Sequence, residues 1–377
     1  MTKNLSLTSG QKYKNFSLLY FLSLFVVLGS AAAINIVIDP YRYFFTQEIT
    51  GLNANKPEYE KYLMLSKAAE ARQIEAKTIL LGSSRIMSGL NKSHPIFQDP
   101  QTVYNLGLPG TNMYQSLQYL KHALYFQKNV ERVIIGIDFF MFNEYLGNLD
   151  NFDETRLGKK FTLSDLVNTS LSIDALQASL ITLNANWNVD NRVVSKESTM
   201  NKFKRWLTNF LSFEGFYKTY RLSQKQLDSF KMIITLCQEH NIDYQVFISP
   251  THATQYQAMD AAQLWSIFED WKREIVSITP VWDFSGYNSI TTEPISESMV
   301  NYIDNSHYSQ HTGNLVLNKI FGEKAETVPP DFGVFIEPDN LESHLDKINF
   351  DRQKWRDNNE KEVEFVGKIK ASLEQKN

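Results

Sequence analysis

Five short apolar runs constrain what most of this 377-residue chain can fold into. Each ends in or is followed by Gly, Asp or Ser, and they cover residues 78–81, 103–106, 133–138, 244–249 and 280–284. Such runs are typical of parallel strands that are buried on both faces. Helical patterns lie between them, over residues 223–240, 257–277 and after Asn112, where apolar residues keep to one face. The sequence therefore predicts an α/β fold, a three-layer α/β/α sandwich with a mostly parallel sheet.

A second feature is the uncharged N-terminal run at residues 16–38, "FSLLYFLSLFVVLGSAAAINIVI". Its length suffices to cross a bilayer core of roughly 30 Å. Lys12 and Lys14 precede the run and Asp39 follows it. The positive-inside bias then predicts that residues 1–15 are cytoplasmic and that everything after Asp39 lies outside. A cleaved signal peptide is the alternative, because "SAAAIN" resembles a cleavage site, but the run continues through Ile38 and favours an uncleaved single-pass transmembrane anchor.

The rest of the chain divides by composition. We expect the α/β domain to cover residues 39–336, with an insertion at about 139–221 that is rich in Asn, Ser, Thr and Asp. This insertion is either a lid over the strand ends or a surface elaboration. Residues 337–377 are highly charged and carry apolar residues at helical spacing, which predicts a C-terminal helical extension. The net charge of −4 gives no reason to expect nucleic acid as a partner, and a single cysteine excludes an intramolecular disulfide.

Three motifs lie where strands are expected to end, and ligand sites in parallel sheets lie beyond the carboxyl ends of the strands. The first, "LLGSSR", places Ser84 just after the first strand. The second, "YNLGLPGTNMYQ", carries Gly107 and Gly110 before a helix N-terminus, whose outward N–H groups suit an oxyanion. The third places Asp304 three residues before His307, a spacing that lets a carboxylate orient an imidazole for general-base catalysis.

Taken together and in this order, the motifs resemble the SGNH (GDSL-like) hydrolase superfamily. The resemblance implies Ser84 as the nucleophile and a catalytic triad completed by Asp304 and His307. It also implies that the N–H groups of Ser84 and Gly110 bind the oxyanion, with Gly107 the less favoured glycine.

One position departs from the family pattern. The third block of the family is Gly-x-Asn-Asp, whose asparagine donates to the oxyanion, whereas "IIGIDFFMFN" places Asp138 there. An ionised carboxylate accepts hydrogen bonds and would repel an oxyanion. Either Asn105, Asn112 or Asn143 replaces the donor, with Asn112 our candidate, or backbone N–H groups act alone, or the chemistry is slow or absent. Losing one such donor typically costs about 100- to 1000-fold in rate.

Other residues near the expected strand ends have two interpretations each. Arg85 either holds an anionic substrate group or pairs with a carboxylate such as Asp138 or Asp283. His252, in "VFISPTHA", either contacts substrate in the same cleft or is structural. We carry Arg85, Gly107 and His252 as candidate substrate-binding residues.

A metal site is another interpretation of the histidine motif. His307 and His311 are four residues apart, but the zincin pattern needs a glutamate where Tyr308 stands. We therefore expect no metal and no cofactor.

An anchor followed by these motifs resembles the bacterial envelope branch of the superfamily, the proteins of teichoic-acid D-alanylation and polysaccharide O-acetylation. The resemblance implies a membrane-anchored, extracytoplasmic serine esterase or O-acyltransferase that acts on a cell-envelope glycan, with a membrane acyltransferase as a candidate partner. The alternative is a catalytically inactive SGNH-like protein that binds glycan or scaffolds an assembly complex. Water or a sugar hydroxyl can accept the acyl group from the same nucleophile, so the sequence does not separate hydrolase from transferase.

Overall fold

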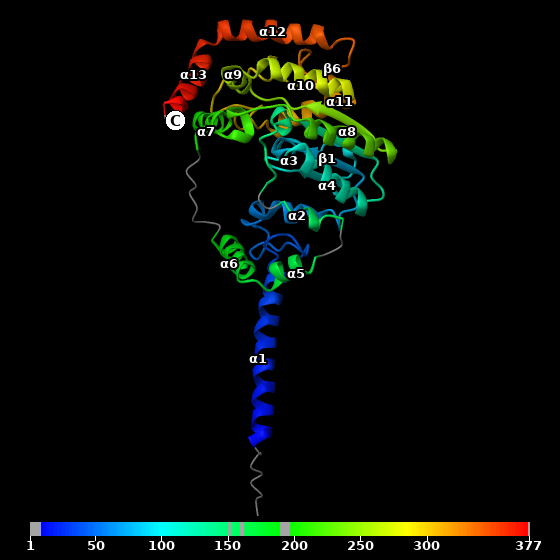
Figure 1. The fold of residues 1–377 in the computed structure, drawn as a ribbon, viewed down its shortest axis with the longest axis vertical. Coiled ribbons are helices and arrows are strands. Elements are labelled where there is room, and N and C mark those ends of the chain that lie inside the picture. The colour runs from blue at the N-terminus through cyan, green and yellow to red at the C-terminus, as the bar shows by residue number, and fades with distance from the viewer. Residues whose placement is uncertain (1–8, 150–151, 159–161, 189–196, 376–377) are drawn as a thin grey trace, which may run out of the picture. The chain divides into compact units, whose positions relative to one another are not determined.

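A computed structural model describes residues 9–149, 152–158, 162–188 and 197–375 (Figure 1). The chain forms two compact units, each assembled from two stretches of sequence. Unit 1 comprises Met1–Glu70 and Lys159–Val194, and unit 2 comprises Ala71–Gly158 and Ser195–Asn377.

Unit 2 contains a six-stranded sheet in the order β2-β1-β3-β4-β5-β6. The first five strands pair in parallel and β6 pairs antiparallel with β5. Their bounds are β1 Thr78–Gly82, β2 Val103–Gly107, β3 Arg132–Ile137, β4 Asp243–Ile248, β5 Val281–Asp283 and β6 Val334–Ile336. The prediction of an α/β fold with a mostly parallel sheet is confirmed. Strand β6 was not predicted, because three residues are too few to show a strand pattern and two of them are exposed.

The central strand β1 is almost entirely apolar because both of its faces are covered. Every residue of β1 is buried, and Ile79, Leu80 and Leu81 have no exposed surface. Successive side chains of a strand point to opposite faces, so a strand covered on both faces loses the alternation of polar and apolar residues. The register pairs Gly82 of β1 with Gly107 of β2, which brings the segments that follow these two strands to the same edge of the sheet.

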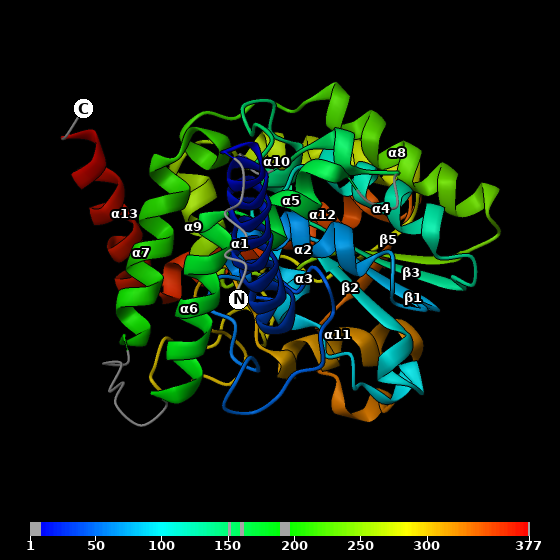
Figure 2. The same ribbon diagram turned by 90° about the horizontal axis from the view of Figure 1, so that it is seen from below.

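Nine α-helices belong to the described part of unit 2 (Figures 1 and 2). They are α3 Ser84–Gly89, α4 Met113–Phe126, α7 Thr199–Ser212, α8 Gln224–Glu239, α9 Ala253–Ala261, α10 Trp265–Ile278, α11 Gln310–Phe321, α12 Leu341–Asn358 and α13 Glu360–Glu374. The single helix expected over residues 257–277 is divided into α9 and α10 at Gln263, whose φ of +61° does not fit a right-handed helix. The helix α13 packs against α7 and α9, as Figure 2 also shows.

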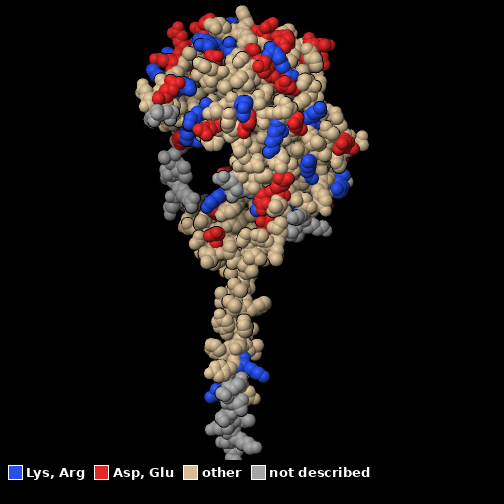
Figure 3. Space-filling view, in the orientation of Figure 1, with Lys and Arg blue, Asp and Glu red and all other residues tan. Residues whose placement is uncertain are grey.

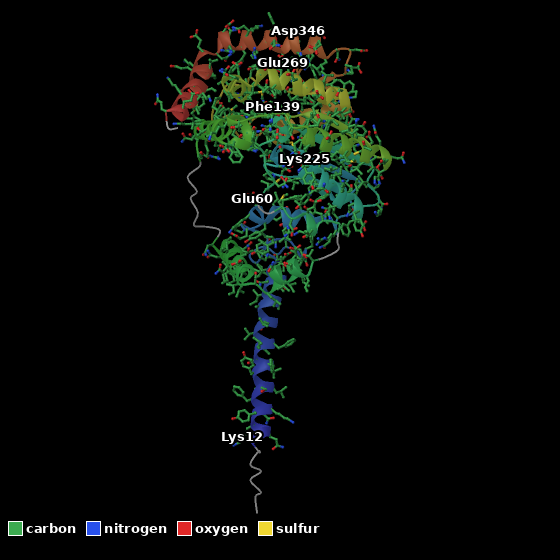
Figure 4. The ribbon with its side chains drawn as sticks, viewed as in Figure 1. Lys12, Glu60, Phe139, Lys225, Glu269 and Asp346 are labelled. Carbon is green, nitrogen blue, oxygen red and sulfur yellow. The ribbon has the colours of Figure 1, made fainter. Side chains whose placement is uncertain are left out.

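Unit 1 contains the long helix α1 Ser9–Ile38 together with α2 Leu63–Glu70, α5 Leu163–Ser170 and α6 Ile173–Trp187 (Figure 1). Among the described residues, α1 is the one helix long and apolar enough to cross a membrane, over Gln11–Ile38, and a signal sequence near an N-terminus meets the same test. Residues 15–38 of α1 include no Lys, Arg, Asp or Glu. The charged residues Lys12 and Lys14 lie near the N-terminal end of this helix (Figures 3 and 4). Both α5 and α6 pack against α1.

Within residues 139–221, where the sequence predicts an insertion, the described helices belong to both units. Helices α5 and α6 are part of unit 1, whereas α7 is part of unit 2. The predicted C-terminal extension contains two helices, α12 and α13, which meet at Asn359.

Candidate active site

The serine, histidine and aspartate of the sequence motifs form one continuous hydrogen-bonded relay. Ser84 Oγ lies 2.9 Å from His307 Nε2. On the other side of the ring, His307 Nδ1 lies 2.9 Å and 3.0 Å from the two carboxylate oxygens of Asp304. Because the carboxylate accepts the Nδ1 proton, Nε2 of the neutral ring is left to accept the proton of the serine hydroxyl.

Ser84 is positioned by the turn between β1 and α3. It is the first residue of α3, and Ser83 before it caps the helix by accepting a hydrogen bond from the Arg85 N–H at 3.1 Å. The turn needs a glycine at position 82, because a Cβ there would lie 2.5 Å from the Gly136 carbonyl oxygen on β3. Ser84 is half-buried, so the tight turn leaves the hydroxyl both accessible and oriented.

A tight turn before α11 fixes the base and its carboxylate. Asp304 Oδ1 accepts hydrogen bonds from the N–H groups of Ser306 and His307, both at 2.8 Å. The Ile303 N–H donates to the His307 carbonyl at 2.9 Å and closes the turn. The Asp304 side chain is therefore held by backbone groups as well as by the imidazole, while the His307 side chain keeps 12% of its surface exposed.

Asp138, the residue that departs from the family pattern, is neutralised inside the protein. Its Oδ1 lies 2.6 Å from Arg85 Nη1 in a pair that is almost completely buried, and its Oδ2 accepts a 2.5 Å hydrogen bond from Ser83 Oγ. Burial alone would lower the pKa of Arg85, but Asp138 outweighs it and holds that pKa above its usual value. Arg85 also donates to Ser306 Oγ at 3.1 Å and 3.3 Å. One buried ion pair thus connects the turn that carries the serine with the turn that carries the histidine.

Two backbone N–H groups remain as candidates for binding an oxyanion. The Ser84 N–H lies in the first turn of α3, where helix N–H groups have no partner within the helix. Gly110, with φ of +66°, follows β2 and comes shortly before α4. By contrast, the Gly107 N–H donates to Asn105 Oδ1 at 3.0 Å. A Cβ at Gly107 would lie 2.4 Å from the Met87 backbone nitrogen, so this glycine allows α3 to approach β2.

The three asparagines considered as replacement donors already use their amide hydrogens. Asn112 Nδ2 donates to the Leu146 and Gly147 carbonyls at 3.1 Å and 3.3 Å, and its Oδ1 caps α4. Asn105 Nδ2 donates to two carbonyls of α3, and Asn143 Nδ2 to three carbonyls between residues 214 and 219. These bonds argue against the predicted oxyanion role of Asn112.

Two of the residues carried as substrate contacts have structural partners instead. Both ring nitrogens of His252 are used, because Nδ1 accepts from the Thr254 N–H at 3.2 Å and Nε2 lies 2.7 Å from the Glu293 carbonyl oxygen. Burial lowers the pKa of His252 to about 4, so the ring is neutral. Arg85 is committed to Asp138 and Ser306, which is the carboxylate pairing that the sequence offered as its alternative role.

Sequence reasoning missed Trp206 of α7. Its ring packs edge-on against the His307 imidazole, with the ring centroids 4.9 Å apart. The Arg205 guanidinium lies over the Trp206 ring at 5.6 Å and pairs with Glu197 at 2.9 Å. The aromatic residues of the predicted insertion were the only sequence feature that pointed to such a contact. No spacing rule connects position 206 with position 307.

A cavity lies elsewhere in unit 2, away from the relay. Among the described residues, no group of three or more His, Cys, Asp or Glu side chains could hold a metal ion. A cavity of about 440 Å³ lies between α12 and the segment after β5. Figure 4 labels Asp346 on α12. The lining of the cavity includes Asp283, His344 and Trp355 and none of the three relay residues.

Comparison of the sequence with models of known protein families and with curated proteins finds no match.

Proposed function

We propose that this protein is an SGNH-type serine esterase or O-acyltransferase in which Ser84 is the nucleophile. The observation that carries the proposal is the relay from Ser84 through His307 to Asp304. It joins two segments of the chain that are more than 200 residues apart. The proposal includes the three-layer α/β/α arrangement of that superfamily around the parallel sheet. It also includes membership of the family, which rests on the three sequence motifs and this geometry.

In the proposed reaction, Ser84 Oγ attacks the acyl carbon of an ester while His307 Nε2 takes the hydroxyl proton. Asp304 stabilises the imidazolium that forms and keeps the ring in its orientation. The developing oxyanion is bound by the N–H groups of Ser84 and Gly110. His307 then donates its proton to the leaving alcohol, which leaves an acyl group on Ser84. Water or a sugar hydroxyl, deprotonated by His307, then attacks the acyl carbon. The bond to Ser84 Oγ breaks, and His307 returns the proton to that oxygen.

The Asp138–Arg85 pair supports a functional site despite the missing asparagine. A free carboxylate beside the oxyanion would oppose the transition state, but Asp138 is neutralised by Arg85 and turned toward Ser83. The oxyanion hole then consists of backbone donors alone. With one donor fewer than the family pattern, we expect a rate roughly 100- to 1000-fold below that of a site with three donors.

The same proposal places the protein on the outer side of a bacterial cytoplasmic membrane, held by an uncleaved α1. The last carbonyls of α1 are capped within unit 1: Val37 O accepts from Asn53 Nδ2 at 3.0 Å, and Ile38 O accepts from Lys56 Nζ at 2.9 Å. Asn35 is fully buried between helices. Cleavage within "SAAAIN" would cut the helix on which unit 1 is built, which supports an anchor over a signal peptide. A cell-envelope glycan is the substrate class, and a membrane acyltransferase the proposed partner.

The test is hydrolysis of p-nitrophenyl acetate by the full chain in detergent. We expect Ser84→Ala and His307→Ala each to lower the enzyme-dependent rate by at least about 1000-fold, since members of a triad act as a unit. Ser88→Ala, a serine on the same short helix, is the matched control and keeps the rate. Equal activity in Ser84→Ala would contradict the proposal. No activity in the parent protein toward this or a glycan ester would favour the inactive, glycan-binding alternative.

A further inference from the structure

The helix α6 buries small and polar side chains and leaves several large apolar side chains exposed. Its buried residues are small or polar, namely Ala175, Ala178, Ser179, Thr182, Ala185 and Asn186. Its large exposed residues are apolar, namely Ile173 at 75%, Leu180 at 57%, Ile181 at 43% and Trp187 at 69%, and they lie beside the exposed polar residues Asp174, Gln177 and Asn184. A surface helix of a water-soluble protein shows the opposite pattern, with its apolar stripe against the core.

The helix α5 before it is reversed in the same way. Asp165, Thr169 and Ser170 are its buried residues. Leu163 and Val167, which share a face at a spacing of four residues, are exposed by 76% and 42%. Leu171, in the turn between α5 and α6, is exposed as well. The two helices therefore present one apolar surface, which we call the α5–α6 surface.

Two polar groups of the α5–α6 segment bond to Asn35 of α1, whereas Asn186 bonds to Asn55. Asn35 of α1 donates from Nδ2 to the Ser170 carbonyl at 2.9 Å and accepts from Ser179 Oγ at 2.8 Å. The other buried residues of α6 include Ala175, Ala178 and Ala185, and α6 packs against α1. Small residues at helix contacts and polar bonds between helices, with large apolar side chains facing outward, are typical of helices packed in a bilayer.

The position of the α5–α6 surface along α1 indicates what covers it. Residues 16–28 of α1 are almost all large, apolar and exposed, as expected for a segment surrounded by lipid. The last residues of that helix are the ones against which α5 and α6 pack. The apolar exterior thus continues from the membrane-spanning part of α1 onto α5 and α6. Figure 3 shows little charge on unit 1 around the C-terminal end of α1.

We propose that the α5–α6 surface is immersed in the outer leaflet of the bilayer that α1 spans, so that unit 1 is a membrane-embedded base rather than a linker. This inference rests on the proposed anchor, with α1 retained. At 1.5 Å per residue, the 15 residues of α6 extend about 22 Å. That length is too short to cross a core of roughly 30 Å, so α6 lies in the interface and the upper acyl region.

The charges of the two helices specify the kind of lipid contact. Between residues 162 and 188 the only charged side chains are Asp165 and Asp174, and there is no Lys or Arg. Attraction to anionic headgroups therefore contributes nothing, and insertion depends on apolar area alone. Immersion is expected to be the same in neutral and anionic vesicles and to be insensitive to salt.

The experiment uses the full chain in phosphatidylcholine vesicles, with Cys237→Ala and a single new cysteine carrying an environment-sensitive NBD fluorophore. Leu180→Cys and Ile173→Cys report on the α5–α6 surface. Leu22→Cys reports on α1. Phe350→Cys on α12 is the matched control, since the 69% exposure of Phe350 lies between the 57% of Leu180 and the 75% of Ile173. A near-UV circular dichroism spectrum that matches the parent's shows that each labelled variant is folded.

We expect labels at positions 22, 173 and 180 to be blue-shifted and quenched by doxyl-labelled lipids, and the label at 350 to behave as in water. A lipid-exposed label at 22 with water-exposed labels at 173 and 180 would overturn this inference while leaving the anchor intact. A water-exposed label at 22 would overturn the anchor itself. Labels at 173 and 180 that are protected from water in native membranes but water-exposed in pure vesicles would show that a membrane protein covers the α5–α6 surface. That result would also overturn the inference.

Discussion

Replacing Asp138 by asparagine separates two accounts of this position. Asp138→Asn installs the residue type that the SGNH family uses as an oxyanion donor. If position 138 faced the oxyanion, the substitution would raise activity. In the structure the Asp138 carboxylate instead lies 2.6 Å from Arg85 Nη1 and 2.5 Å from Ser83 Oγ. The variant should therefore lose stability and gain no activity.

The size of the loss follows from burial. The side chains of Arg85 and Asp138 are only 5% and 1% exposed. Removing one partner of a buried pair leaves the other charge uncompensated, which costs about 3–5 kcal/mol. An exposed pair with the same chemistry contributes below about 1 kcal/mol. Arg132 and Asp243 form such a pair at 3.0 Å, so Asp243→Asn is the matched control.

The assay is urea unfolding of the full chain in detergent, followed by near-UV circular dichroism. We expect Asp138→Asn to lower the free energy of unfolding by about 3–5 kcal/mol and Asp243→Asn by less than about 1 kcal/mol. Combining Asp138→Asn with Arg85→Met removes both charges. The loss of unfolding free energy in the double variant should be smaller, by at least about 1 kcal/mol, than the sum of the losses in the two single variants. An Asp138→Asn variant of unchanged stability and higher esterase activity would refute the structural role of Asp138.

Three further predictions concern the same unit. Gly107→Ala should lower the free energy of unfolding by about 1–3 kcal/mol or more, because its Cβ would lie 2.4 Å from the Met87 nitrogen. Gly110→Ala should lower it by about 1–2 kcal/mol in the same urea titration. Its Cβ would lie an ordinary 3.6 Å from Leu149, but the φ of +66° disfavours any residue except glycine. His252 should make unit 2 less stable in acid: its pKa in the folded protein is about 4, below the ordinary 6.5, so the unfolded chain binds the proton first and about 3 kcal/mol is lost between these pH values. His252→Asn should flatten that part of the stability–pH curve, and an unchanged curve would argue against it. Asp283→Asn should lower the free energy of unfolding by about 3–5 kcal/mol at neutral pH, because the fully buried Lys272 loses its counter-charge. Burial would raise the pKa of Asp283, but Lys272 and His344 outweigh it and hold that pKa below its usual value. The parent protein therefore keeps the stability that this pair contributes until the pH falls below about 4.

The sequence predicted the parts of the fold that depend on local patterns. The five parallel strands were predicted within a residue or two, because the parts of them that are covered on both faces are short apolar runs. The break between α9 and α10 was not predicted, since Gln263 carries no glycine or proline signal for its left-handed backbone. The separation into two units was equally invisible, because it joins residues 159–194 to the N-terminal segment through contacts between helices distant in sequence.

The candidate site shows the same division between local and distant information. The turn that fixes Asp304 against His307 is encoded in four residues and could be expected from their spacing. The role of Asp138 could not, because its neutralisation depends on Arg85, 53 residues earlier in the chain. The sequence offered Asp138 and Asp283 as partners for Arg85, and only the structure distinguishes them. Trp206 lies against His307 through packing that no motif describes.

The central claim is that Ser84 is a nucleophile activated by His307, and trapping it with a fluorophosphonate tests this most directly. The probe is added to the full chain in detergent, and the product is examined by intact mass and by mass spectrometry of the peptide that contains residues 78–89. The account predicts one phosphonate per chain, attached to Ser84, with labelling lost in Ser84→Ala, reduced at least about 1000-fold in rate in His307→Ala, and unchanged in Ser88→Ala. Folded protein that remains unlabelled, or labelling at Ser83 or Ser88 that persists in His307→Ala, would contradict it.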